Sequence, residues 1–143
     1  MKNNSIIIML MLAPFCSLAA NNCTPNLTGQ DMCTVANEIV NATNKYIPIK
    51  YDDNMNIVNA KAENTRVILT TQMNYNRIDL EKEYGNSEER IEESKTFSRR
   101  YAREKVCSNR SSKAFVNLGG VIQYEYFFND GKLFDIVTVT SCK

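Results

Sequence analysis

Residues 121–142 read VIQYEYFFNDGKLFDIVTVTSC. Two runs rich in aromatic and β-branched residues flank Asp130-Gly131, a dipeptide that favours a two-residue type I′ turn. The stretch therefore predicts a β-hairpin. Because two strands alone are only marginally stable in water, the rest of the chain must supply more strands and a covering helix.

The length of the turn decides which residues of the two strands face each other. With a two-residue loop, Tyr124 faces Val137 and Tyr126 faces Asp135. This register predicts a core face made of Ile122, Tyr124, Tyr126, Phe128, Leu133, Val137 and Val139. A bulge that lengthens the loop by one residue would bring Phe134 and Ile136 to that face in place of Leu133 and Val137. The sequence leaves both registers open.

The N-terminus predicts export. A positively charged residue precedes an apolar run, Ile6–Phe15, that is too short to span a bilayer, and small residues follow it. We expect residues 1–20 to be a cleaved signal peptide and residues 21–143 to form a single periplasmic domain. An uncleaved anchor is the alternative, and Cys16 lies in a poor match to a lipidation motif. No second long apolar segment follows, so no membrane span is expected after cleavage.

Four cysteines remain without Cys16, and in an exported chain this number predicts two disulfides. Three pairings are possible, and proximity in the sequence favours Cys23–Cys33 and Cys107–Cys142. A zinc site is the alternative, but the chain has no histidine and no Cys-x-x-Cys pair. We therefore expect neither a metal nor another cofactor.

Two segments predict helices. Apolar residues at helical spacing indicate a helix over about 29–46, and Thr28 with Asp31 resembles a capping box at its start. Ser87 begins a second, highly charged helix that continues to a turn at 107–112. Its acidic residues come early and its basic residues late, an order that suits the helix dipole.

The remaining segments complete the predicted fold. Residues 56–62 and 65–73 alternate in polarity like two strands of a second hairpin, with Glu63-Asn64 between them. Residues 74–86 form a polar connection, and 113–118 a short helical or extended piece. The order α-β-β-α-β-β predicts an α+β fold: a four-stranded antiparallel sheet of two hairpins, covered by two main helices.

Little in the sequence points to catalysis. The absence of histidine removes the commonest general base and the usual partner of a serine or cysteine nucleophile. Carboxylates that could in principle serve a glycosidase are Asp52, Asp53, Glu88, Glu89, Glu92, Glu93 and Asp130. Acids on a charged helix or at a turn are usually solvated, so we expect a protein that is not an enzyme.

The charge balance favours a protein partner over a nucleic acid, because 17 Lys and Arg stand against 16 Asp and Glu. One candidate surface is the free edge of the sheet, which could accept a strand. The other is the basic half of the charged helix, made of Arg99, Arg100, Arg103 and Lys105. The plain alternatives are a solvated helix face and an edge already covered by the N-terminal arm.

Residues 107–142 carry a recognisable pattern: a cysteine, a short helical turn, Gly-Gly-Val-x-x-Tyr-x-Tyr, a turn, and a strand ending in cysteine. Its positions are Cys107, Leu118, Gly119, Gly120, Val121, Tyr124, Tyr126, Gly131 and Cys142. This pattern resembles small disulfide-bonded periplasmic α+β proteins of Gram-negative bacteria. Some exported proteins of this kind are accessories in pilus or secretion-system assembly, and others are immunity proteins against periplasmic toxins.

The resemblance implies a function without catalysis. We expect a periplasmic accessory protein that contacts a protein partner in the bacterial envelope, in the assembly of a type IV pilus or a secretion system. The alternative is an immunity or inhibitor protein against a toxin or hydrolase, and a small enzyme ranks third.

Overall fold

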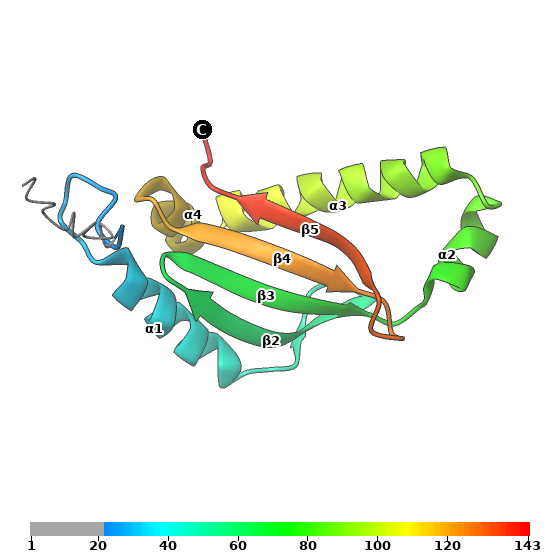
Figure 1. The fold of residues 1–143 in the computed structure, drawn as a ribbon, viewed down its shortest axis with the longest axis horizontal. Helices are drawn as coiled ribbons and strands as arrows, with labels where there is room; N and C mark the ends of the chain where they lie inside the picture. Colours follow the sequence, from blue (N-terminus) through cyan, green and yellow to red (C-terminus); the bar gives the residue numbers. More distant parts are fainter. Residues whose placement is uncertain (1–21) are drawn as a thin grey trace, which may run out of the picture.

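The structure is a computed structural model that describes residues 22–143, so the predicted signal peptide lies outside the described residues. Figure 1 shows helices packed beside a single twisted sheet. In chain order the elements are α1 (Met32–Asn44), β1 (Ile49–Lys50), β2 (Met55–Glu63), β3 (Arg66–Met73), α2 (Arg77–Tyr84), α3 (Glu88–Ser108), α4 (Arg110–Asn117), β4 (Val121–Phe127) and β5 (Leu133–Val139).

The sheet has five strands in the order β1-β2-β3-β4-β5, and the pair β3–β4 is parallel. Both predicted hairpins are present, as the antiparallel pairs β2–β3 and β4–β5. The predicted four-stranded antiparallel sheet with two helices is wrong, because the two hairpins meet through parallel strands and β1 adds a fifth strand beside β2. Parallel neighbours need a long crossover, and residues 74–120 supply it with three helices.

The loop of the C-terminal hairpin differs from the predicted turn. The N–H of Gly131 donates to the carbonyl of Phe128 at 3.0 Å, and Gly131 has a φ of 82°. Within residues 22–143 only Asn64 and Asn86 have positive φ among non-glycine residues, so Asp130 does not. A type I′ turn would need positive φ at both Asp130 and Gly131. The chain instead makes a longer loop whose last residue, Gly131, takes the left-handed conformation.

The register of this hairpin combines the two alternatives. Tyr124 pairs with Val137 and Tyr126 with Asp135, as the two-residue loop predicts. A register shift then pairs Phe127 with Leu133 and leaves Phe134 as the additional residue of a β-bulge. Phe134 is consequently buried at 9% exposure, whereas Leu133 is 51% exposed.

The helices begin at side-chain caps, not all of which were expected. Asp31 caps α1 by accepting the N–H of Thr34, whereas Thr28 bonds to Asn26 in the preceding arm, so the predicted capping box is wrong. Ser87 caps α3 as predicted. That helix continues through Cys107 to Ser108, where a turn was expected, and α4 follows directly. The polar connection 74–86 contains α2, which has a capping box of its own.

Helices α1, α3 and α4 share one apolar core with the sheet. α1 packs on β2 and β3, α3 on β5, and α4 on β4. The largest fully buried core residues are Met32 of α1, Ile91 and Val106 of α3, Val116 of α4, and Val67 and Tyr126 of the sheet. The helices are therefore held over opposite halves of the sheet by separate sets of contacts.

Four tyrosines form the centre of this core. The hydroxyls of Tyr51 and Tyr126 lie 3.0 Å apart, and the hydroxyl of Tyr101 donates to the carbonyl of Tyr51 at 3.4 Å. The rings of Tyr51 and Tyr124 pack with centroids 5.3 Å apart. Burial raises the pKa of Tyr124 to about 12, and it raises the pKa values of Tyr51 and Tyr126 well above the ordinary range. Tyr51, Tyr124 and Tyr126 therefore keep their protons to a higher pH in the folded protein than in the unfolded chain.

Two disulfides tie the ends of the domain to its helices. Cys23 bonds to Cys33 at the start of α1, and Cys107 of α3 bonds to Cys142 just after β5. This is the pairing that proximity in the sequence favours. The second bond fixes α3 to the end of the sheet where its last strand finishes.

The two disulfides should differ in their effect on stability. Cys107–Cys142 closes a 35-residue separation and Cys23–Cys33 a 10-residue one. Loop entropy then gives about 4 and about 3 kcal/mol respectively. We expect the double variant Cys107→Ser/Cys142→Ser to lose about 1 kcal/mol more than Cys23→Ser/Cys33→Ser in urea unfolding. Equal losses of unfolding free energy in the two double variants, or the opposite order, would contradict a larger contribution from Cys107–Cys142.

The tyrosine cluster predicts a loss of stability at high pH. In the unfolded chain Tyr124 ionises near its ordinary pKa of 10, whereas in the fold it keeps its proton to about 12. The folded state thus binds more protons between these values, so the free energy of unfolding should fall as pH rises through that window. Tyr124→Phe should flatten the slope. Tyr46→Phe, at a 75% exposed tyrosine, is the matched control and should leave it unchanged.

Candidate partner-binding groove

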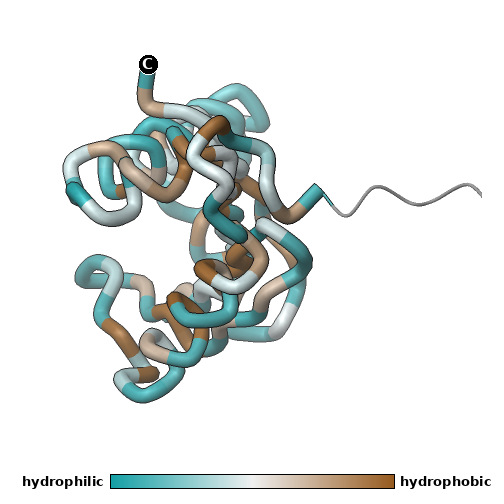
Figure 2. Tube along the Cα trace, turned by 90° about the vertical axis from the view of Figure 1, so that its left-hand side faces the viewer, coloured by the Kyte–Doolittle hydropathy of each residue, from teal (hydrophilic) through white to brown (hydrophobic). Residues whose placement is uncertain are grey.

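A groove of about 400 Å³ opens on the helix side of the sheet, between α1 on one side and α3 with α4 on the other. Figure 2 shows the trace coloured by hydropathy, with hydrophobic and hydrophilic residues interspersed along the chain. The apolar lining comes from α1 and three strands or their ends, and consists of Ile39, Ile49, Tyr51, Ile57, Ile122 and Tyr124. A cavity of this volume falls within the range of known ligand pockets.

Each lining residue is placed there by the period of its own element. Ile39 lies three residues after the fully buried Ala36, so it borders the core stripe of α1 and is only partly buried. Ile122 and Tyr124 alternate along β4 and point to the helix side. Little of the floor is accessible, because Ile122 is 5% and Tyr124 6% exposed. A partner would therefore insert small apolar side chains and contact the rim more widely.

The rim of the groove carries two lysines. Lys50 pairs with Asp53 at 2.7 Å, and the hydrogen bond and charge of that carboxylate raise the pKa of Lys50. Lys105 lies with its Nζ atom 5.0 Å from the ring centroid of Tyr101, and no carboxylate among residues 22–143 pairs with it. Lys105 is exposed and leaves the rim with an available positive charge. An apolar segment flanked by acidic residues fits this arrangement.

The four basic residues predicted as one surface lie on different sides of α3. Arg99 pairs with Asp135 of β5, and Arg103 donates to the backbone oxygen of Lys143. Arg100 stacks over the ring of Phe97, away from the sheet. Lys105 borders the groove. Because successive helical residues are about 100° apart, Arg99 and Arg103 share the side of α3 that faces β5, whereas Arg100 points in another direction.

Four of the acidic residues considered for catalysis form ion pairs at the surface, namely Asp53, Glu88, Glu92 and Asp130. Glu92 pairs with Lys95 at 2.7 Å, and this bond lowers the pKa of Glu92. Glu88 pairs with Arg77, also at 2.7 Å. Each of these pairs is solvated, and none of the four carboxylates lines the groove. Glu89, Glu92 and Glu93 line a cavity of about 480 Å³ on the outer face of α3, beside Phe97 and Arg100.

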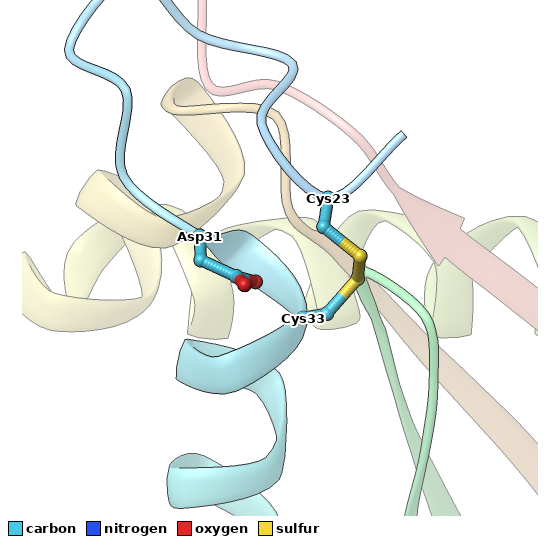
Figure 3. A group of neighbouring side chains, drawn as sticks. All are labelled: Cys23, Asp31 and Cys33. Carbon is cyan, nitrogen blue, oxygen red and sulfur yellow. A yellow bond between two sulfur atoms is a disulfide. The ribbon is translucent and has the colours of Figure 1, made fainter. Parts of the chain in front are cut away.

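One group of side chains has the composition of a metal site. Figure 3 shows Cys23, Asp31 and Cys33 together, and it is the one such group of three found in residues 22–143. The two sulfurs are bonded to each other, and Asp31 accepts the N–H of Thr34 as the cap of α1. The group is therefore accounted for by a disulfide and a helix cap.

The groove was not predicted from the sequence, because its lining residues have the spacing that is typical of a buried core. Ile122 and Tyr124 belong to the predicted core face of the hairpin, and Ile39 to the apolar stripe of the first helix. Whether such a stripe is covered depends on the distance between the two helices that pack beside it. The sequence of neither helix determines that distance. Nothing in the described part of the chain forms a helix long and apolar enough to cross a membrane.

Comparison with known proteins gives a likeness of fold. No protein-family model and no curated protein matches the sequence. Among solved structures, the chain is similar to a protein of Pseudomonas aeruginosa described as secreted, with 11% identity, a TM-score of 0.59, and coverage of 76% of this chain and 88% of that one.

Two further similar structures are pilotins of type II secretion systems. One is AspS of Vibrio cholerae, with 16% identity, a TM-score of 0.57, and coverage of 76% of this chain and 88% of the pilotin. The other is EpsS of Vibrio vulnificus, with 14% identity, a TM-score of 0.56, and coverage of 77% and 88%. At such low identity these comparisons establish a shared fold, and a shared fold does not by itself fix a function.

Proposed function

We propose that this protein is a non-enzymatic accessory of a bacterial secretion system, which binds a protein component of that system in the cell envelope. The observation that carries the proposal is the groove with an apolar lining between α1 and α3–α4. The similarity of the fold to two type II secretion pilotins supports the setting.

The groove would bind its partner by burying apolar side chains between two walls of different character. Ile39 of α1 offers an apolar wall, whereas Ser112 of α4 and Lys105 of α3 make the opposite rim polar. A partner segment with an apolar stripe and an acidic flank would satisfy both walls at once. A cavity of about 400 Å³ holds only a few side chains, so the partner would insert a single helix or short segment.

An exported location is part of this proposal. Two disulfides suit an oxidising compartment such as the periplasm. The predicted cleaved signal peptide would deliver the domain there. The comparisons with known structures give no support to a role in pilus assembly or to the inhibitor alternative, so neither belongs to the proposal.

Photo-crosslinking in the native cell tests the groove directly. A photoreactive phenylalanine analogue in place of Ile39 should crosslink to a component of a secretion machine, because this position lies in the groove wall. The same analogue in place of Ile78, a 61% exposed isoleucine on α2, is the matched control and should not. Crosslinks to the same component from both positions, or only to unrelated proteins from Ile39, would overturn the proposal.

A charge reversal at the rim tests the proposed acidic flank without disturbing the core. Lys105→Glu should weaken binding of the crosslinked component by about tenfold, since an attraction becomes a repulsion. Lys113→Glu, on the exposed surface of α4, makes the same change of charge outside the groove lining. Equal affinities of the two variants would count against an acidic flank, provided that both variants keep the melting temperature of the parent protein.

A further inference from the structure

The two edges of the sheet differ in whether their backbone groups are paired. The outer side of β2 is occupied where β1 pairs with Asn56 and Ile57. Farther along, the side-chain amide of Asn44 bonds to both backbone groups of Ala60, at 3.0 Å to its carbonyl and 3.2 Å from its N–H. No strand within residues 22–143 pairs with the outer side of β5. The open edge of this sheet is therefore β5.

The N-terminal arm does not cover this edge. Asn26 donates to the carbonyl of Leu118 at 3.1 Å, and the ring of Pro25 lies against Gly119. These contacts place the arm at the turn before β4, where a Cβ on Gly119 would meet the proline ring at 2.4 Å. The arm is thus held against the turn between α4 and β4, and its described residues form no strand beside β5.

Only half of β5 can accept another strand. Near the hairpin loop, the bulge at Phe134 interrupts the regular strand, and the carboxylate of Asp135 turns toward α3 to pair with Arg99. Bulges and inward charges are features that block unwanted pairing at sheet edges. From Ile136 to Val139 the strand is regular and pairs normally with β4.

A cavity of about 260 Å³ runs along this regular half. Its lining is made of the four consecutive residues from Ile136 to Val139 together with Arg99 and Arg103 of α3. Figure 1 shows β5 at the border of the sheet, with α3 running alongside it. The slot thus has a strand edge as one wall and a basic helix face as the other.

The charge of this slot comes mainly from Arg103. Arg99 makes two bonds to Asp135, at 3.2 and 3.3 Å, so its charge is largely balanced. Arg103 donates once, to the main-chain oxygen of the last residue, Lys143, at 2.9 Å, and no Asp or Glu side chain among residues 22–143 pairs with it. Because a guanidinium has five N–H donors, Arg103 can still bind an incoming carboxylate.

We propose that the edge of β5 from Ile136 to Val139 accepts an extended, acidic segment of a partner protein as an additional strand, with a carboxylate bound by Arg103. The backbone of β5 would supply the hydrogen bonds, and Arg103 would select for negative charge. The exposed side chain of Ile136, at 46%, would pack against the incoming strand. This surface is separate from the groove, so the two proposals stand or fall independently.

A peptide probe tests the proposal on the whole mature protein. The probe is a short acetylated peptide in which glutamate alternates with valine, and the readouts are binding affinity and the hydrogen exchange of backbone amides. We expect slower exchange for amides in 136–139 and no change at Ile39 or Tyr124 in the groove. A peptide with lysine in place of glutamate, and one methylated on alternate backbone nitrogens, should each bind at least about tenfold more weakly.

Variants identify the residues involved. Arg103→Glu should weaken binding of the acidic peptide by about tenfold, whereas Arg90→Glu, at an exposed arginine outside the slot on the same helix, should not. The proposal is overturned if the acidic peptide does not bind, if the lysine or methylated peptide binds equally well, or if the protected amides lie in the groove. Unchanged peptide binding by Ile39→Glu would separate this edge from the groove.

Discussion

Parallel pairing of β3 with β4 is the constraint on which the rest of the structure depends. Antiparallel neighbours can be joined by a short turn, but parallel ones require the chain to return along the full length of the sheet. Residues 74–120 make this return through α2, α3 and α4, and they come back to the sheet with Val121 beside Arg66. The crossover helices lie over β4 and β5, whereas α1 lies over β2 and β3. The separation of these two helical groups leaves the groove over the middle of the sheet.

The same constraint explains why the two ends of the chain are fastened as they are. The long crossover would leave α3 attached to the sheet mainly through β5, and the Cys107–Cys142 disulfide fixes it at that strand. The other disulfide orients α1 at its first turn. With both helical groups anchored at one end, the groove can be held open without contacts across it. The tyrosine cluster beneath it, joined by the Tyr51–Tyr126 hydrogen bond, provides a rigid floor.

Local features of this fold could be predicted from the sequence, and non-local ones could not. The alternation of apolar and polar residues in β4 and β5 predicted the pairing of Tyr124 with Val137. The four cysteines that remain without Cys16 predicted the two disulfides. The parallel pairing of β3 with β4 was missed because the alternation of polar and apolar residues in a strand is the same whether its neighbour runs parallel or antiparallel. The bulge at Phe134 was missed because Leu133 and Phe134 are equally suited to burial. The groove was missed because Ile39 and Tyr124 have the pattern of core residues, and only the spacing of the helices leaves a cavity beside them.

Methyl NMR of isoleucine-labelled protein, titrated with the segment of the partner that crosslinks at position 39, tests the central claim most directly. The isoleucines are distributed so that Ile39, Ile49, Ile57 and Ile122 report on the groove, Ile136 on the open edge, and Ile78 on the remote surface of α2. The account predicts that the four groove methyls shift together and that Ile78 does not. Shifts confined to Ile78, or absent from all four groove methyls while the segment binds, would show that the open groove is not where this protein meets its partner.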